Sequence, residues 1–186
     1  MRLAEMITFK VGKSPINLRA SLRAATNMES KYGFEQLFYA CADGNLSVLA
    51  DVIEISSDNR GFLKSIVDIP LIEVMPPLLE NLPSHILALA GVDPDKKVES
   101  QGGASIPFAE YHAKLFRIGT GWLGWSPEQT WNATPSEILE AYSGHLEMLR
   151  AVHGGAEAEQ SNPAAPDNAA FDRKGLHGLK SLSGVA

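Results

Sequence analysis

The sequence predicts a mainly α protein with an N-terminal β-hairpin, and three observations support this fold class. Near the N-terminus, apolar and polar side chains alternate over residues 7–11 and 16–19, on either side of the turn residues Gly12-Lys13-Ser14-Pro15. After that, apolar residues recur at helical spacing as far as Val152. Capping and glycine signals divide this helical part into short segments, so we expect several short helices.

The first helix is expected to begin after Ser21, whose hydroxyl can cap it, and to end at Gly33, which tolerates a left-handed conformation. Its apolar face is formed by Leu22, Ala25, Met28 and Tyr32. Three short helices should follow: one over 34–42 closed by Asp43-Gly44, one over 46–55 opened by Asn45, and one after Asp58-Asn59 through Phe62 and Ile66.

The longest apolar helical segment runs from about Pro70 to Gly91 and contains prolines at 76, 77 and 83. A proline ring clashes with the preceding turn of a helix and supplies no N–H. We therefore expect the prolines to divide or kink this helix, with a restart at Pro76-Pro77 after Met75. The apolar end, residues 86–90, is expected to be buried.

Residues 93–105 are polar, contain glycine and show no periodicity, which is typical of a linker. The chain is therefore predicted to have an N-terminal module over 1–92 and a small three-helix module over 106–152. Residues 153–186 are rich in Ala, Glu, Asn, Pro and Gly and are predicted to form a disordered tail. The last part of the tail, 171–186, is either free or a short docking segment.

All three tryptophans lie in the short stretch 121–137 of the second module. Ser126-Pro127-Glu128-Gln129 and Thr134-Pro135-Ser136-Glu137 both have the pattern of a capping box with proline at the first helical position. Upstream, one helical stripe is formed by Phe108, Tyr111, Leu115, Ile118 and Trp122. Downstream, the last helix should present an apolar face of Ile138, Tyr142, Leu146, Leu149 and Val152, with Glu137, Glu140, Glu147 and Arg150 facing water.

Composition excludes several classes of protein. The net charge of −6 is spread along the chain and forms no basic patch, which argues against nucleic acid as a partner. No apolar run reaches the roughly 18 residues of a membrane span, and the N-terminus lacks the pattern of a signal peptide. The single cysteine, Cys41, excludes an intrachain disulfide, so we expect a cytoplasmic protein.

No catalytic, metal or cofactor site is predicted. His85 lies among apolar residues, and His112 and His145 do not share a helix face with a neighbouring glutamate, so neither forms a zinc motif. Cys41 follows an apolar run and is expected to be a structural thiol. A small-molecule enzyme using His85 or His112 is therefore disfavoured, because no acid–base partner with suitable spacing accompanies either ring.

The tryptophans allow two interpretations. In the first, all three close a very small helical core; in the second, at least one is an exposed anchor for another protein, because Trp is enriched in interface hot spots. We expect a mixture, with Trp122 and Trp131 pointing inward and Trp125 left open. A DNA-binding interpretation is disfavoured, since the last helix presents mainly glutamates rather than the Arg, Lys, Asn or Gln of a recognition helix.

The stretch 106–149 resembles the small tail assembly chaperones of siphophages and gene transfer agents. The resemblance lies in Ser126, Pro127, Trp131, Thr134, Pro135 and Glu137, which stand at the family's two caps and its aromatic position. The N-terminal part is more loosely similar to the companion tail protein of gene-transfer-agent-like clusters. Together they resemble the two-module, long frameshift product of long-tailed phages.

The resemblance implies a non-enzymatic tail assembly chaperone of a phage, prophage or gene transfer agent, without cofactors, acting in the bacterial host cytoplasm. It implies binding to the tape measure protein and recruitment of tail tube subunits, with self-association left open. The candidate protein-binding residues are Trp122, Trp125, Trp131, Tyr142 and Leu146; of these, Trp125 and Trp131, with the outer surface of the 135–152 helix, are expected to contact the tube protein. The alternative is a structural tail completion or joining protein that stays in the particle.

Overall fold

A computed structural model describes residues 6–57, 60–92 and 106–153. The mainly α fold class is confirmed, and so is the N-terminal hairpin of β1 (Met6–Val11) and β2 (Ser14–Arg19). The two strands are antiparallel, with Phe9 opposite Ile16. Because side chains alternate between the faces of a strand, Phe9, Val11, Ile16 and Leu18 all point into the core.

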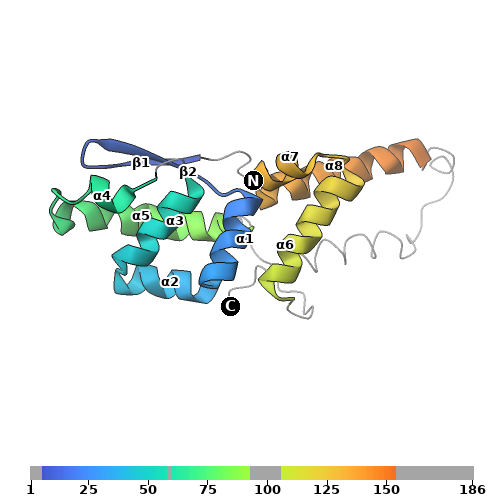
Figure 1. Cartoon of the computed structure of the whole chain (residues 1–186). Coiled ribbons are helices and arrows are strands. Elements are labelled where there is room, and N and C mark those ends of the chain that lie inside the picture. Colours follow the sequence, from blue (N-terminus) through green and yellow to red (C-terminus); the bar gives the residue numbers. More distant parts are fainter. Residues whose placement is uncertain (1–5, 58–59, 93–105, 154–186) are drawn as a thin grey trace, which may run out of the picture.

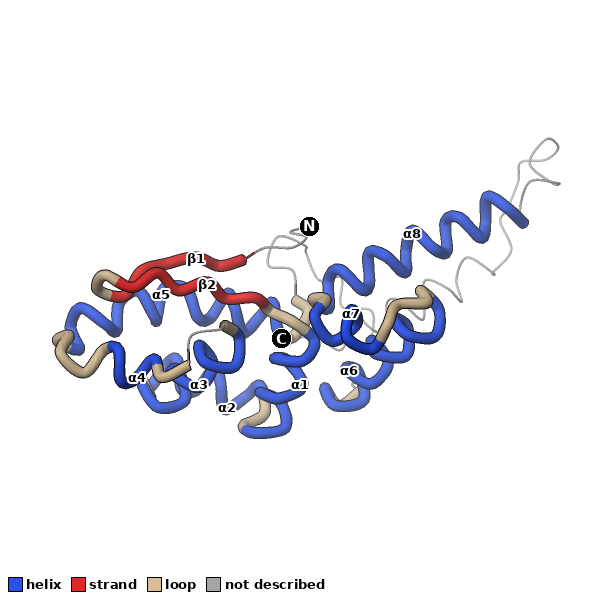
Figure 2. The backbone as a smooth tube through the Cα atoms, turned by 45° about the horizontal axis from the view of Figure 1, so that its top comes forward, coloured by secondary structure: helices blue, strands red, loops and turns tan. Residues whose placement is uncertain are grey.

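The hairpin covers a bundle of five helices, as Figures 1 and 2 show. They are α1 (Leu22–Lys31), α2 (Phe34–Asp43), α3 (Leu46–Ser56), α4 (Phe62–Ser65) and α5 (Leu71–Leu89). Ser21 and Asn45 cap α1 and α3 through their side chains, as predicted, accepting from the amides of Ala24 and Val48. Helix α4 is shorter than predicted, because it ends at Ser65 before Ile66.

Helix α5 runs without interruption through Pro76, Pro77 and Pro83, so the predicted restart at Pro76-Pro77 is wrong. Tertiary packing explains the difference: Val74 before the proline pair, and Leu78 and Leu82 after it, are fully buried in one core. The side chain of Asn81 also donates to the Pro77 carbonyl at 2.8 Å. Burial on both sides of the pair therefore outweighs the local preference of proline to break a helix.

The C-terminal part consists of α6 (Phe108–Arg117), the π-helical turn η1 (Ile118–Trp122), α7 (Pro127–Asn132) and α8 (Pro135–His153). The predicted three-helix arrangement is thus present, with an added π turn between its first two helices. Its core contains Tyr111, Leu115, Ile118, Ala133 and Ile138. Helix α8 extends beyond α6 and α7 and away from the hairpin (Figure 2).

The start of α1 belongs to this second core as well. Leu22 is fully buried with the α6–α8 residues, and its backbone N–H donates to the Ala133 carbonyl at 2.8 Å. Helix α1 lies between α3 and α6 in Figure 1. The division into modules over 1–92 and 106–152 remains a prediction; the predicted linker 93–105 and the tail from residue 154 lie outside the described residues.

Candidate protein-binding surface

Both predicted capping boxes are present. The Ser126 hydroxyl accepts from the Gln129 amide at 3.2 Å, and the Gln129 side chain accepts from the Ser126 amide at 2.8 Å. Thr134 and Glu137 form the same reciprocal pair, at 3.1 and 2.7 Å. These bonds satisfy amides that the first turn of a helix leaves unpaired, so the direction of α7 and α8 is set locally.

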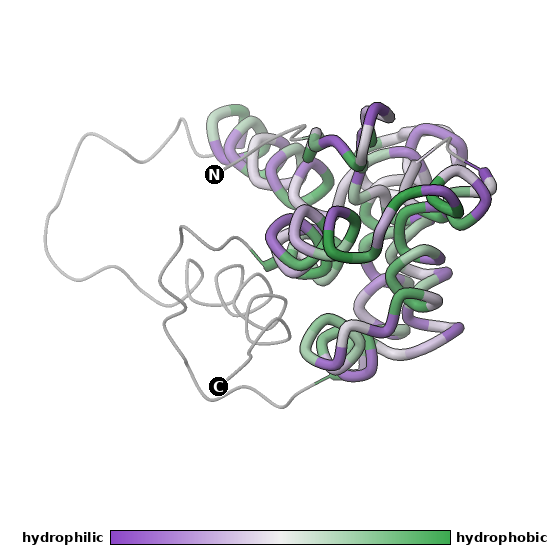
Figure 3. Tube along the Cα trace, turned by 90° about the vertical axis from the view of Figure 1, so that its left-hand side faces the viewer, coloured by the Kyte–Doolittle hydropathy of each residue, from purple (hydrophilic) through white to green (hydrophobic). Residues whose placement is uncertain are grey.

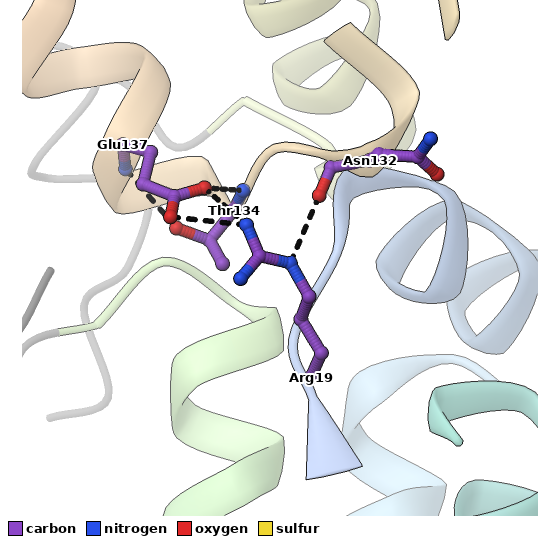
Figure 4. Close-up of polar contacts among 4 residues, drawn as sticks. All are labelled: Arg19, Asn132, Thr134 and Glu137. Carbon is purple, nitrogen blue, oxygen red and sulfur yellow. Dashed lines mark hydrogen bonds and ion pairs between the residues drawn. The ribbon is translucent and has the colours of Figure 1, made fainter. Parts of the chain in front are cut away.

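An arginine at the end of the hairpin joins the last residue of α7 to the cap of α8 (Figure 4). Arg19 donates through Nη2 to both carboxylate oxygens of Glu137, at 3.0 and 2.9 Å, and through Nε to the Asn132 carbonyl at 3.1 Å. The prediction that Glu137 faces water is therefore wrong: its side chain is 20% exposed and binds both the Thr134 cap and Arg19. A second, more exposed ion pair connects Arg23 to Glu128 at 2.9 Å.

The turn between α6 and α7 is built around Gly119. A Cβ at this position would lie 2.4 Å from Cγ2 of Thr130, which is fully buried. The Gly119 carbonyl accepts from the Trp125 amide at 3.0 Å, and the Ile118 carbonyl accepts from the Leu123 amide at 3.0 Å. The second bond is the i→i+5 bond of a π turn, which adds one residue to the turn.

This π turn moves Trp122 to the surface, so the prediction that Trp122 points inward is wrong. Tyr111, Leu115 and Ile118 follow the 3.6-residue repeat and are buried, but the extra residue breaks the repeat before Trp122. The Trp122 side chain is 58% exposed. Its ring meets that of Tyr142 on α8 edge to face, with centroids 6.1 Å apart, so the exposed indole is held by a second aromatic ring.

Trp131 and Trp125 are less exposed than Trp122. Both are half-buried against the second core, and Trp131 packs on Phe116 with ring centroids 4.6 Å apart. The inward orientation predicted for Trp131 thus agrees with its packing. Of the three tryptophans, Trp122 presents the most surface to a partner.

The outer part of α8 continues the apolar surface beyond Tyr142. Leu146 and Leu149 are half-buried, while Met148 and Val152 are 52% and 69% exposed. Only Pro135 and Ile138 of this helix are fully buried. Trp122 contacts Tyr142, and Leu146 lies one turn further along α8 on the same side as Tyr142, so we call these three residues the Trp122 face. Trp125 and Trp131 instead pack against the second core.

The buried histidines have no acid–base or metal partner among the described residues. Burial lowers the pKa of both His85 and His112 to about 4, so both rings are neutral near pH 7. His112 is surrounded by the rings of Phe34, Phe108 and Tyr111, at centroid distances of 5.6–6.3 Å. Burial also raises the pKa of the Cys41 thiol, which disfavours its nucleophilic thiolate form.

The described part of the chain contains neither a candidate metal site nor a helix that could span a membrane. No group of three or more His, Cys, Asp or Glu side chains there is placed to hold a metal ion. Nor is any helix within 6–57, 60–92 and 106–153 long and apolar enough to cross a membrane.

One comparison with known proteins gave a match, and it lies in the C-terminal part of the chain. Residues 111–153 match the model of a family described as phage tail assembly chaperone protein, TAC. The matched segment begins at the buried Tyr111 and contains both capping boxes, η1 and the whole of α8. Neither the curated proteins nor the solved structures gave a match. A general role in phage tail assembly therefore rests on this C-terminal segment.

Two features of the site could not be predicted from the sequence. Arg19 and Glu137 are 118 positions apart, so nothing local connects the hairpin to the second cap. Gly119 was visible only as a weak glycine signal in Gly119-Thr120-Gly121. Its role follows from its close approach to Thr130, which depends on how α7 folds back.

Proposed function

We propose that this chain is a non-enzymatic tail assembly chaperone of a phage, prophage or gene transfer agent. It binds the tape measure protein, covers its apolar surface and recruits tail tube subunits in the bacterial host cytoplasm. The observation that carries the proposal is the match of 111–153 to the tail assembly chaperone family. The exposed Trp122, held by Tyr142 inside that same segment, supplies the docking group.

The geometry of the Trp122 face suits reversible docking of a protein. An indole contributes a large apolar area with few rotatable bonds, and such side chains dominate binding energies when a partner covers them. The two capping boxes and the Arg19–Glu137 pair hold α7 and α8 in place before binding. Little ordering is then required on association, which favours affinity.

Co-expression with the neighbouring tube and tape measure proteins tests the proposal. The unaltered chain should co-purify with the tube protein, and Trp122→Ala combined with Tyr142→Ala should weaken the complex by at least about tenfold. Tyr39→Ala is the matched control, because Tyr39 is an equally exposed aromatic (60%) on α2. The absence of a tube complex, or one unaffected by the double substitution in a folded chain, would contradict the proposal.

Mass spectrometry of purified particles separates the chaperone from a structural tail completion or joining protein. A chaperone acts during assembly and should be missing from finished particles. A structural component should be present at a fixed number of copies per tail. Detection at that level would replace the chaperone proposal with the structural one.

A further inference from the structure

A second apolar surface lies at the other end of the molecule, on the outer side of α5. Ile72, Pro76, Leu79 and Pro83 follow one another at spacings of four, three and four residues, which places them on one face of the helix. Ile72 is 82% exposed and Leu79 39% exposed. We call these four residues the α5 stripe; at 1.5 Å per residue it is about 16 Å long, or three helical turns.

Three more exposed apolar residues precede the stripe in the chain, between α4 and the first residue of α5. They are Leu63, Val67 and Leu71, which are 40%, 76% and 59% exposed. Figure 3 looks onto this end of the molecule and shows hydrophobic (green) stretches of tube among hydrophilic ones. Half of the exposed large hydrophobic residues of the described chain thus belong to the segment from Leu63 to Leu79, which indicates a binding surface.

The charges beside the stripe indicate what kind of partner it fits. Glu73 and Glu80 are exposed and lie seven residues apart, so they form a row along one side of the stripe. Asp68 adds a third carboxylate at its beginning, and Lys64 is the single basic residue between Leu63 and Pro83. A partner bordered by lysine or arginine would complement this row, whereas one bordered by carboxylates would be repelled.

The prolines supply an independent reason for a partner that donates hydrogen bonds. Pro76 and Pro83 have no N–H, so the carbonyls of Ile72 and Leu79 receive no helical bond from four residues ahead. These two carbonyls belong to the two exposed aliphatic residues of the stripe. Lysine and arginine carry several donors and no acceptor, so they match these carbonyls as well as the glutamates.

We propose that the α5 stripe is a docking site for an amphipathic helix of another protein whose apolar face is bordered by lysine or arginine. An amphipathic helix docks on an apolar surface through its own anchors at spacings of three and four residues, which matches the spacing of the stripe. The stripe is separate from the Trp122 face and stands whether or not that face binds the tube protein. With both surfaces, one chain holds two partners at opposite ends (Figure 1).

Two labelled peptides test this proposal by fluorescence anisotropy at physiological salt. One is an 18-residue amphipathic helix of leucine and lysine, and the other has glutamate in place of every lysine. The full chain should bind the lysine peptide, should bind it more weakly as salt increases, and should not bind the glutamate peptide. Equal binding of both peptides, or binding of neither, would overturn the proposal.

Variants locate the binding on the protein. Ile72→Ser with Leu79→Ser should weaken lysine-peptide binding at least tenfold, and Glu73→Gln with Glu80→Gln should weaken it severalfold and reduce its salt dependence. The matched control is Glu140→Gln with Glu147→Gln, which removes the same charge from exposed positions of α8 and should leave binding unchanged. Circular dichroism confirms folding, which these exposed positions should not disturb.

Two results would assign the surface differently. If binding persists in the Ile72→Ser, Leu79→Ser variant, the peptide attaches elsewhere through general charge attraction, and the proposal fails. If sedimentation equilibrium shows a dimer of the unaltered chain that this variant abolishes, the occupant is a second copy of the chain. Either result would overturn docking by a basic partner helix.

Discussion

At the scale of single residues, Gly119 decides how the tryptophan stretch folds. The π turn, the Thr130 contact and the Trp125 amide bond all meet at this position. Without a side chain, Gly119 lets α7 approach η1 closely enough for Thr130 to be fully buried. The exposure of Trp122 therefore depends on the π turn that contains this glycine.

Gly119→Ala should destabilise the fold by about 1–3 kcal/mol, because the new Cβ would lie 2.4 Å from Thr130 Cγ2. Gly121→Ala is the matched control: nothing lies within 4 Å of its Cβ, so it should be neutral or stabilise by up to about 1 kcal/mol. Urea denaturation measures both. Equal stability of the two variants would contradict the close packing at Gly119.

At the scale of elements, the caps and the hairpin end act together. Arg19–Glu137 combines an ion pair with two hydrogen bonds at a joint between β2 and α8, while Arg23–Glu128 is a more exposed pair between α1 and α7. The first pair connects the hairpin, and the second connects α1, to the C-terminal segment. The two ion pairs differ in geometry and in exposure to solvent, so we expect them to differ in their contribution to stability.

A double-mutant cycle on Arg19→Met and Glu137→Gln should give a coupling of about 1 kcal/mol, reduced by the partial exposure of Arg19. Gln at 137 can keep the cap, as Gln129 does at the first box. The same cycle on Arg23 and Glu128 should give close to zero, since their side chains are 48% and 72% exposed. Equal coupling energies in the two cycles would contradict a stronger interaction of Arg19 with the cap of α8.

The continuous helix α5 carries prolines at an energetic cost. Pro76→Ala should stabilise the protein by about 1–3 kcal/mol, because alanine restores an N–H to the Ile72 carbonyl and removes a ring clash. Pro70→Ala, at the N-cap of α5, should change stability little, since proline fits there. Thermal unfolding compares them, and destabilisation by Pro76→Ala would mean that the ring is needed for packing.

At the scale of the whole molecule, two buried histidines make stability depend on pH. Burial favours the neutral rings of His85 and His112, whose pKa values fall from 6.5 to about 4. The unfolded chain therefore takes up protons that the folded chain does not. Their contribution to stability is complete above pH 6.5 and is lost progressively as the pH falls from 6.5 toward 4.

Urea midpoints at pH 7.5 and pH 5 test this dependence. The unaltered protein should lose stability between the two values, by up to about 1.4 kcal/mol per pH unit for each ring. His112→Leu should flatten the dependence, whereas His153→Gln, at an exposed position, should not. An unchanged pH slope in His112→Leu would contradict the buried, neutral ring.

Sequence signals predicted the features that depend on neighbouring residues. The hairpin, the Ser21 and Asn45 caps, both capping boxes and the helix end at Asp43-Gly44 all follow from a few adjacent positions. Errors arose at two places: α5 stays whole because distant packing buries both sides of Pro76-Pro77, and Trp122 turns outward because the π turn breaks the helical repeat. The residues of the Trp122 face were therefore predicted, but the outward orientation of Trp122 was not.

Electron microscopy of particles from the strain that carries this gene tests the central claim most directly. With the chain replaced by the Trp122→Ala, Tyr142→Ala variant, the fraction of particles with complete tails should fall sharply, while Tyr39→Ala should leave it unchanged. A normal fraction of tailed particles with a folded double variant would contradict chaperone action through the Trp122 face.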